Sequence, residues 1–401
     1  MKYDDEDELK RRIDVMKTDS DGDLVWQQSF GTSGYNYGKF SIQLRDGRYV
    51  IAGAITSESI LCRVLIVLNE TNGVELSRLV LPNDGEHEHL QDGFMSVVET
   101  SQAGIVAAVG FVGGENSTTG YTDEPMFLIG GGHVGMSVVD LNSMKVLDDV
   151  ILDDDDLDFT ATQGMRVLRD ETRDQYVVSH TTTSKDRDGN FEFGMSAFSI
   201  ESDKIKTQWT FQYVADVSTT LTGHASHPYA LTIGNNDDAY VIGGLAVIND
   251  AKGSEQCQGR LLAVSPDSGD VQWDRRFTSS EKDTNIECYG IQTVERDGGY
   301  ILTCGTGVEP EVHPHDSDKS KTWRVLVHRT DSAGEMLWQD VYTSNDKLQN
   351  NAGEYIISTR NDNGYAVFVD SQSWGPGSTG GNFAIMRLDP DRASFSEYNN
   401  N

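Results

Sequence analysis

Three close pairs of histidines lie in polar stretches that are also rich in carboxylates. The pairs are His87 and His89 in GEHEHLQDG, His224 and His227 in GHASHPY, and His313 and His315 in EVHPHDSD. Imidazole and carboxylate groups together can bind a transition metal where imidazole dominates, or calcium where oxygen dominates. Because a metal site needs three or four converging ligands, one pair falls short of a site, and solvated loop residues are the simpler interpretation.

The metal hypothesis includes one further stretch and leaves the ion open. Its candidate ligands are His87, His89, Asp92, His224 and His227, with Asp186, Asp188 and Asn190 of the turn DRDGN. This turn resembles a calcium loop, but Phe191 and Ala197 stand where an EF-hand has its glycine and its bidentate glutamate. We therefore expect either no ion here or a Ca²⁺ or another divalent cation.

Six hairpins of one kind must position these residues. Segments 40–56 and 289–307 alternate apolar and polar residues around an Asp-Gly turn, the strongest short-range hairpin signal. Four more segments fit the same template with weaker turns, namely 94–111, 165–180, 229–244 and 354–370. The spacing of about 60 residues and a second hairpin in each interval indicate a repeat of four strands.

Repeated four-stranded sheets predict an all-β fold, a six-bladed β-propeller of antiparallel blades. The chain begins with a strand pair in residues 12–30 and ends with three strands in residues 354–389. We expect these N- and C-terminal strands to close the last blade together. Residues 1–11 would be an acidic tail and residues 12–398 a single propeller domain, with a seven-bladed, N-terminally truncated propeller as the alternative.

The residues just before the first strand of each blade should line the mouth of the central channel. By register they are Tyr37, Asp92, Gln163, His227, Glu287 and Asn351. Such a polar set could hold a cation or a small polar ligand, although channel mouths are also polar simply because they are wet. Tryptophans stand at one fixed place in the last strand of four repeats, at Trp26, Trp209, Trp273 and Trp338, where they should pack between blades. In the second and third repeats this place holds Ser77 and Asp149.

The blade sequence resembles known propeller repeats. The turn VLNETNG followed by a last strand with tryptophan is similar to quinoprotein-type propellers, and DGGYILTCG resembles uncharacterised microbial repeats with W…DGGYIIAG blades. The resemblance covers nearly the whole chain and implies the fold. A quinone cofactor does not follow from it, because two blades lack the tryptophan and no adjacent cysteine pair is present.

Composition and short motifs limit the binding partners and the cellular compartment that we expect for this protein. A formal charge of -32 argues against nucleic acid, and no apolar run is long enough for membrane insertion. The N-terminus has no signal peptide in this form, yet sequons at Asn69 and Asn116 fit an extracellular or surface-associated protein. Cys62, Cys257, Cys288 and Cys304 allow three pairings or free thiols, and a Cys288–Cys304 bridge would need a bulge.

Two classes of function remain. The first is a non-catalytic binding propeller whose long loops bind a protein, a glycan or a small cationic ligand. The second is a metal-dependent propeller hydrolase or lactonase, in which a cation at the channel mouth acts as Lewis acid and His227 as general base. No catalytic motif in the sequence decides between them.

Overall fold

The computed structural model describes residues 12–32, 34–57, 60–82, 91–114, 131–152, 157–184, 191–213, 226–249, 255–280, 284–307, 322–343, 350–359, 363–371 and 382–390. Within these ranges the chain is built from 25 β-strands and one short 3₁₀ turn, η1 (Asn235–Asp237). None of the described segments is a helix with the length and apolarity needed to cross a membrane. The chain divides into two compact units, Lys2–Val214 and Ala215–Asn401, which we call the N-terminal and C-terminal units.

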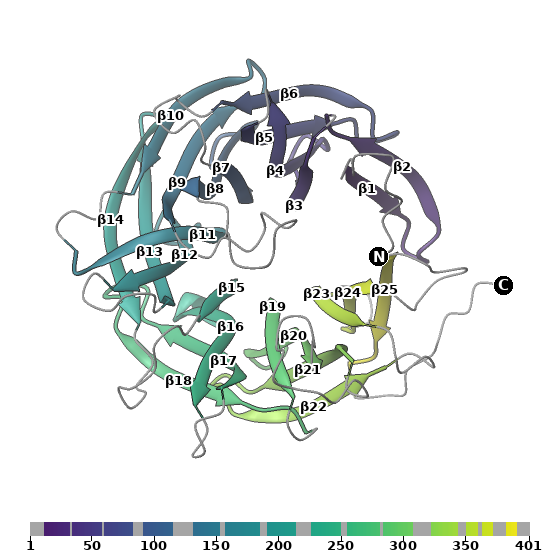
Figure 1. Cartoon of the computed structure of the whole chain (residues 1–401), viewed down its shortest axis with the longest axis vertical. Helices are drawn as coiled ribbons and strands as arrows, with labels where there is room; N and C mark the ends of the chain where they lie inside the picture. Colours follow the sequence, from purple (N-terminus) through teal and green to yellow (C-terminus); the bar gives the residue numbers. More distant parts are fainter. Residues whose placement is uncertain are drawn as a thin grey trace. The chain divides into compact units, whose positions relative to one another are not determined.

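The N-terminal unit contains three complete blades and one hairpin, with the strands of each sheet in chain order (Figure 1). The hairpin is β1 (Ile13–Thr18) and β2 (Leu24–Phe30). The first blade is β3 (Asn36–Gln43), β4 (Tyr49–Ser57), β5 (Ile60–Leu68) and β6 (Glu75–Leu81). The second is β7 (Gln91–Glu99), β8 (Ile105–Gly114), β9 (Gly131–Asp140) and β10 (Lys145–Ile151). The third is β11 (Phe159–Asp170), β12 (Gln175–Ser184), β13 (Phe191–Glu201) and β14 (Lys204–Tyr213).

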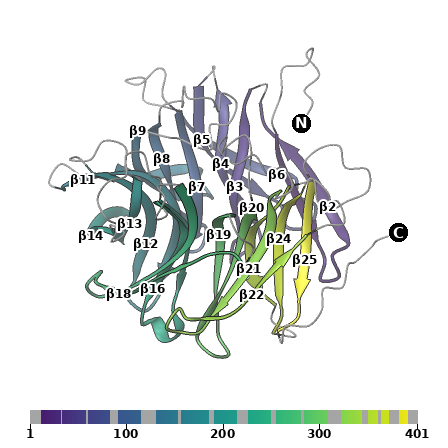
Figure 2. The same ribbon diagram turned by 60° about the horizontal axis from the view of Figure 1, so that its bottom comes forward.

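The C-terminal unit contains two complete blades and a three-stranded sheet, and the last two strands of this sheet run side by side in Figure 2. One blade is β15 (His227–Ile233), β16 (Tyr240–Asn249), β17 (Glu255–Val264) and β18 (Val271–Phe277). The other is β19 (Asn285–Val294), β20 (Gly299–Gly307), β21 (Arg324–Thr330) and β22 (Met336–Tyr342). The last sheet is β23 (Asn351–Ser358), β24 (Tyr365–Ser371) and β25 (Asn382–Leu388).

This strand content confirms the predicted fold class. The fold is an all-β six-bladed propeller, five of its sheets are complete four-stranded antiparallel blades, and the described residues contain no helix other than η1. The strands outside the five complete blades are the two N-terminal and three C-terminal strands that the sequence assigns to the sixth blade. Their pairing across the two units stays a prediction.

Middle strands are apolar on both faces because each face packs on a different neighbour. In β8, Val106 and Ala108 belong to the core cluster shared with the blade β3–β6. Ala107 and Val109, which point the other way, belong to the cluster shared with the blade β11–β14. The last strands are half-exposed instead, as in β2, so they alternate in sequence. A single blade therefore cannot bury both its faces, and the repeat stabilises itself through its neighbours.

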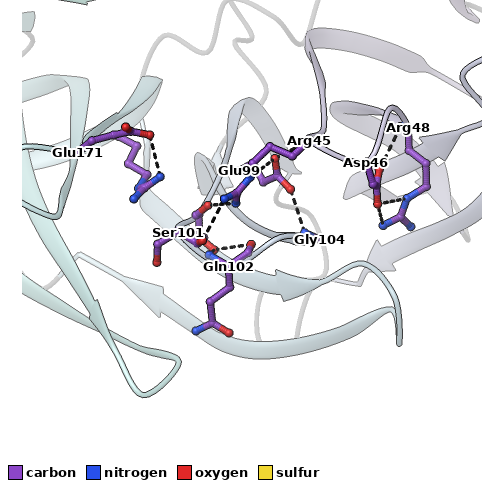
Figure 3. Close-up of polar contacts among 10 residues, drawn as sticks. Arg45, Asp46, Arg48, Glu99, Ser101, Gln102, Gly104 and Glu171 are labelled. Atoms are coloured by element: carbon purple, nitrogen blue, oxygen red, sulfur yellow. Dashed lines mark hydrogen bonds and ion pairs between the residues drawn. The ribbon is translucent and has the colours of Figure 1, made fainter.

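Charged side chains in the short turns link neighbouring blades of the N-terminal unit (Figure 3). Arg45, in the turn after β3, pairs with Glu99 of the next blade at 3.0 Å and donates to the carbonyl oxygen of Ser101 at 3.1 Å. Glu99 also accepts the backbone N–H of Gly104 at 2.9 Å. These contacts lower the pKa of Glu99 although its partial burial opposes the change. The polar groups of these turns thus have a structural use.

Two tryptophans of the last strands pack against the following blade, as the sequence predicts. Trp26 donates its indole N–H to the carbonyl oxygen of Glu70 at 3.3 Å, and a Cβ added at Gly73 would lie 2.5 Å from its ring. Trp273 leaves equally little room at Gly334, where an added Cβ would lie 2.7 Å from its ring. The glycine in each following turn is therefore required by the tryptophan that covers it.

Candidate functional site

Every complete blade has a β-bulge in its first strand, and so does the C-terminal sheet. The register with the second strand shifts by one residue in β3, β7, β11, β15, β19 and β23. A bulge leaves one residue without a cross-strand partner and re-aims its side chain. The residues at these shifts are Lys39, Met95, Thr162 and Met165 in the N-terminal unit, and Pro228, Tyr229, Tyr289 and Glu354 in the C-terminal unit.

In the C-terminal unit the bulges bring aromatic and acidic groups together. The ring centroids of Tyr229 and Tyr289 are 4.9 Å apart, and His227 stacks on Tyr229 at 5.5 Å. The Tyr289 hydroxyl donates a hydrogen bond to the carboxylate of Glu287. Glu354 acts electrostatically on both tyrosines. We call His227, Tyr229, Glu287, Tyr289 and Glu354 the bulge cluster.

The bulge cluster is partly buried. Four of its side chains are half-buried, and Glu354 is exposed. Desolvation raises the pKa of Glu287, against the hydrogen bond from Tyr289 that lowers it. Desolvation and the negative charge of Glu287 hold the pKa of Tyr289 well above its usual range. The cluster therefore presents protonated phenols beside Glu287, whose charge is poorly solvated, and beside the exposed Glu354.

Burial also keeps His227 neutral. Desolvation lowers the pKa of its imidazole to about 4, so the ring carries no charge at neutral pH. A neutral imidazole can accept or donate a proton in principle, but this one is a weak base. The stacked ring therefore serves better as an aromatic wall than as the general base that the sequence suggested.

The predicted set of channel-mouth residues is partly brought together. His227 and Glu287 are linked in the C-terminal unit through the rings of Tyr229 and Tyr289, whereas Asn351 is buried and accepts a hydrogen bond from Ser371 Oγ at 2.6 Å. In the N-terminal unit Tyr37 is buried near Asp92, whose charge adds to desolvation in raising the pKa of the phenol. No contact of Gln163 with either of these is observed.

Register explains the difference between the predicted and observed positions. Counted from the bulge, the residues equivalent to His227 and Glu287 are Gly93 in β7 and Ala352 in β23. The sequence-based register for Asp92 and Asn351 is therefore one residue too early, within the range expected.

Tyr229, Tyr289 and Glu354 were missed because alternation alone does not reveal a bulge. Glycines near the bulges are the available signal. A Cβ added at Gly290 would lie 2.9 Å from the Cα of Tyr355, and one added at Gly353 would lie 1.9 Å from Thr303 Oγ1. A glycine next to a first strand's polar residue thus marks a close approach of neighbouring strands.

The predicted metal ligands are mostly outside the described residues. His87, His89, His224, Asp186, Asp188 and Asn190 belong to that group. Among the residues that the structure describes, no three His, Cys, Asp or Glu side chains are grouped as metal ligands. Asp92 instead accepts the N–H of Gly113 at 2.9 Å and lies 4.0 Å from Arg63 Nε.

Arg63 in β5 links the first two complete blades of the N-terminal unit. Its guanidinium forms a two-point pair with Asp149 of β10, at 2.8 and 2.9 Å, and donates to Ser137 Oγ at 3.1 Å. The sequence-based register for Asp149 is one residue too late, because Asp148 pairs with Val138 just after the bulge, as Trp273 pairs with Ala263. Asp148 contacts Lys204 Nζ of the next blade at 2.6 Å, so charge and hydrogen bonds hold both seams.

Comparison with known proteins supports the fold and nothing narrower. No known protein family and no curated protein matches the chain. Among solved structures, the GH93 alpha-L-arabinofuranosidase of Fusarium graminearum matches with a TM-score of 0.50 and 8% identity, covering 87% of this chain and 91% of that chain. Quinohemoprotein alcohol dehydrogenase from Comamonas testosteroni matches with a TM-score of 0.49 and 13% identity, covering 96% and 65%. The periplasmic gluconolactonase of Pseudomonas aeruginosa matches with a TM-score of 0.43 and 10% identity, covering 80% and 76%.

These identities show a shared fold alone, since one propeller shape carries unrelated activities. The specific likeness to quinoprotein-type repeats stays a prediction.

Proposed function

We propose that the protein is a binding propeller that holds a small organic cation at the bulge cluster. The observation that carries this proposal is the placement of two tyrosine rings, 4.9 Å apart, beside Glu287 and near Glu354. An aromatic face attracts a cation by about 0.5 to 2 kcal/mol, more when the cation is desolvated. A carboxylate beside the rings supplies the countercharge.

The rest of the chain favours the same class of ligand. A formal charge of -32 attracts cations over the whole surface and increases their rate of encounter. The phenols of both tyrosines are neutral at physiological pH, and their raised pKa moves ionisation still further from it, so the aromatic faces stay uncharged. An anionic ligand would face Glu287 and Glu354 with no described cation in the cluster to offset them.

Isothermal titration calorimetry with simple probes tests the proposal. Tetramethylammonium and butylammonium should bind, whereas 1-pentanol, a neutral analogue of butylammonium, should bind at least tenfold more weakly. Glu287→Gln should weaken butylammonium binding about tenfold or more, because it removes the charge and keeps the shape. Glu171→Gln, on the exposed surface of the N-terminal unit, is the matched control. Absence of binding by both cations, or equal affinity in Glu287→Gln, would contradict the proposal.

A hydrolase is the second candidate, favoured by the two carboxyl groups in unlike surroundings. Glu287 has a raised pKa and could donate a proton, while Glu354 on the neighbouring β23 is exposed. Esters, lactones and glycosides should be assayed with and without a chelator. Turnover lost in Glu287→Gln would support this candidate, and chelator-sensitive turnover would support the predicted divalent cation. Monosaccharides in the same calorimetric series test a glycan ligand.

We also propose an extracellular or surface location. The Cys288–Cys304 disulfide supports it, because disulfides persist in oxidising compartments. Asn69, the first sequon, lies in the β5–β6 turn, where its side chain caps the N–H of Thr71 at 2.9 Å. Fractionation of the native source, with glycan analysis of the recovered chain, tests this location.

A further inference from the structure

A disulfide lies directly beneath the bulge cluster. Cys288 in β19 bonds to Cys304 in β20, and both are fully buried in the apolar core of the C-terminal unit. Cys288 stands between Glu287 and Tyr289 in the sequence, so its side chain points away from the face that these two share. Two members of the cluster are thus attached to the backbone on either side of one half-cystine.

The bridge also sits at the bulge itself. Cys288 and Cys304 are cross-strand partners, and the register shift follows immediately, between Cys288 and Gly290. Their Cα atoms are 3.9 Å apart, closer than the roughly 4.5 Å of the closer class of antiparallel pairs. The disulfide therefore sets the spacing of β19 and β20 at the residue that precedes the bulged Tyr289.

The other side of the bulge has no room to take up a shift. An added Cβ at Gly290 would be 2.9 Å from the Cα of Tyr355, so β19 already lies close to β23 at this point. Because no free volume beside β19 can absorb a shift, a change in the β19–β20 spacing must move Tyr289 relative to Glu287 and Tyr229.

We propose that the Cys288–Cys304 disulfide is a redox switch for the bulge cluster: the oxidised chain binds the organic cation, and the reduced chain binds it more weakly. This inference rests on the proposed function. The site would then be active in an oxidising compartment and inactive in a reducing one, which fits a binding protein that works outside the cell.

The switching reaction is thiol–disulfide exchange with a dithiol reductant. One thiolate of the reductant attacks a cysteine sulfur and releases the other cysteine as a thiol, and the second thiolate then resolves the mixed disulfide. The dithiol becomes a cyclic disulfide and the protein gains two thiols, so atoms and electrons balance. Without a bond, the two sulfurs separate to van der Waals distance, about 3.5 to 4 Å, and the strands part at the bulge.

Because both sulfurs are buried, exchange needs a local opening of β19 and β20. Binding and oxidation are then linked reciprocally: if the disulfide strengthens cation binding by some factor, the bound cation favours the disulfide by the same factor. Saturating butylammonium should consequently slow reduction by dithiothreitol and shift its equilibrium.

The test compares the oxidised chain with the dithiothreitol-reduced chain, with the thiol state checked by alkylation and mass spectrometry. Butylammonium affinity by calorimetry should fall tenfold or more on reduction and return on reoxidation. Two free thiols could disturb the apolar core, so the variant Cys288→Ala/Cys304→Val, which keeps the core apolar, serves as a second test. Its affinity for butylammonium should equal that of the reduced chain. Cys62→Ala, which removes a cysteine of the N-terminal unit that is not in a disulfide, should bind as the parent does.

A readout without ligand separates this inference from the proposed function. Reduction should shift the ring resonances of Tyr289 and speed amide exchange at residues 287–290, while circular dichroism shows the fold retained. Unchanged Tyr289 resonances, or equal affinity in a fully reduced and folded chain, would overturn the switch. An oxidised chain that binds no cation would overturn the proposed function instead.

Discussion

Ser77 Oγ in β6 lies 3.2 Å from Met144 Sδ of the following blade. At two other seams the equivalent pair is a tryptophan on the last strand and a glycine in the next turn, Trp26 with Gly73 and Trp273 with Gly334. The large side chain has therefore moved from strand to turn at this seam, and the volume between the blades is conserved. Met144 has φ 52°, a left-handed conformation that glycine adopts at lower cost.

This exchange predicts strong coupling between the two positions. Ser77→Trp alone should destabilise the protein by about 1 to 3 kcal/mol, because the indole and Met144 compete for one space. Met144→Gly alone should change stability little, since lost packing is offset by relief of the positive φ. The double variant should recover about 1 kcal/mol or more relative to additivity, measured by urea unfolding. Additive effects would mean that the seam does not share one volume.

The fold could be predicted because the same turn and packing signals recur in the sequence of several blades. Asp-Gly turns such as Asp46-Gly47, where Gly47 has φ 93°, and the fixed tryptophan position give each blade its register independently of its neighbours. Ser77 was recognisable as an exception to that pattern, whereas the structure places Asp148 and not Asp149 at the other exception. Their partners on the next blade, Met144 and Lys204, were not recognisable, because each lies in another blade and has no fixed spacing from the residue it contacts.

The sequence predicted the positions of the candidate site residues only to within one residue. His227 and Glu287 were found because the start of each first strand is visible in the sequence. The extra residue of a bulge is a tertiary feature, set by the close approach of strands at Gly290 and Gly353. The same bulge settles the pairing of Cys288 with Cys304, which the spacing alone left open.

Cation binding should weaken as the pH falls through the raised pKa of Glu287. The carboxyl must be ionised to attract the ligand, and its pKa in the free protein lies above the ordinary 4.5. Affinity for butylammonium should therefore be highest at neutral pH and above, and should fall in acid earlier than an ordinary carboxyl would titrate. His227, with a pKa of about 4, stays uncharged through most of this range.

Calorimetry from pH 8 to pH 5, in buffers of different ionisation enthalpy, measures both the affinity and the proton released on binding. Glu287→Gln should show a flatter profile. An identical pH profile in parent and variant would assign the dependence to another group.

Protein stability should fall between about pH 6.5 and pH 4 through buried histidines. His180 in β12 is fully buried, bonds through Nε2 to Ser196 Oγ at 2.8 Å, and has its pKa lowered from 6.5 to about 4 by desolvation. Between these values the unfolded chain binds a proton that the folded chain does not, so acid favours unfolding. Above pH 6.5 the contribution is fully present. His227 and His328 have the same shift and add to the slope.

Urea unfolding at pH 7 and pH 5 checks this, comparing the parent with His180→Gln. The variant should lose roughly 1 to 3 kcal/mol at pH 7, because glutamine cannot repeat the imidazole's packing and hydrogen bond. It should also lose part of the difference in stability between the two pH values. A pH difference as large as that of the parent would show that His180 does not titrate with unfolding.

The Arg63–Asp149 pair predicts an asymmetry between removing one partner and removing both. Arg63 has only 7% of its side chain exposed and is held by Asp149 and Ser137, whereas the Asp149 side chain is 37% exposed. Asp149→Ala should leave the buried guanidinium with only Asp92, 4.0 Å from Arg63 Nε, as its countercharge, which costs about 1 to 3 kcal/mol because water reaches the pair. Arg63→Met/Asp149→Leu, which fills the seam with apolar atoms, should be more stable than Asp149→Ala. Arg78, which pairs with Glu75 at a half-exposed position, provides Glu75→Ala as the control, with an expected loss under about 1 kcal/mol. If the double variant is the least stable of the three in urea, the charge pair itself stabilises the seam more than an apolar contact would.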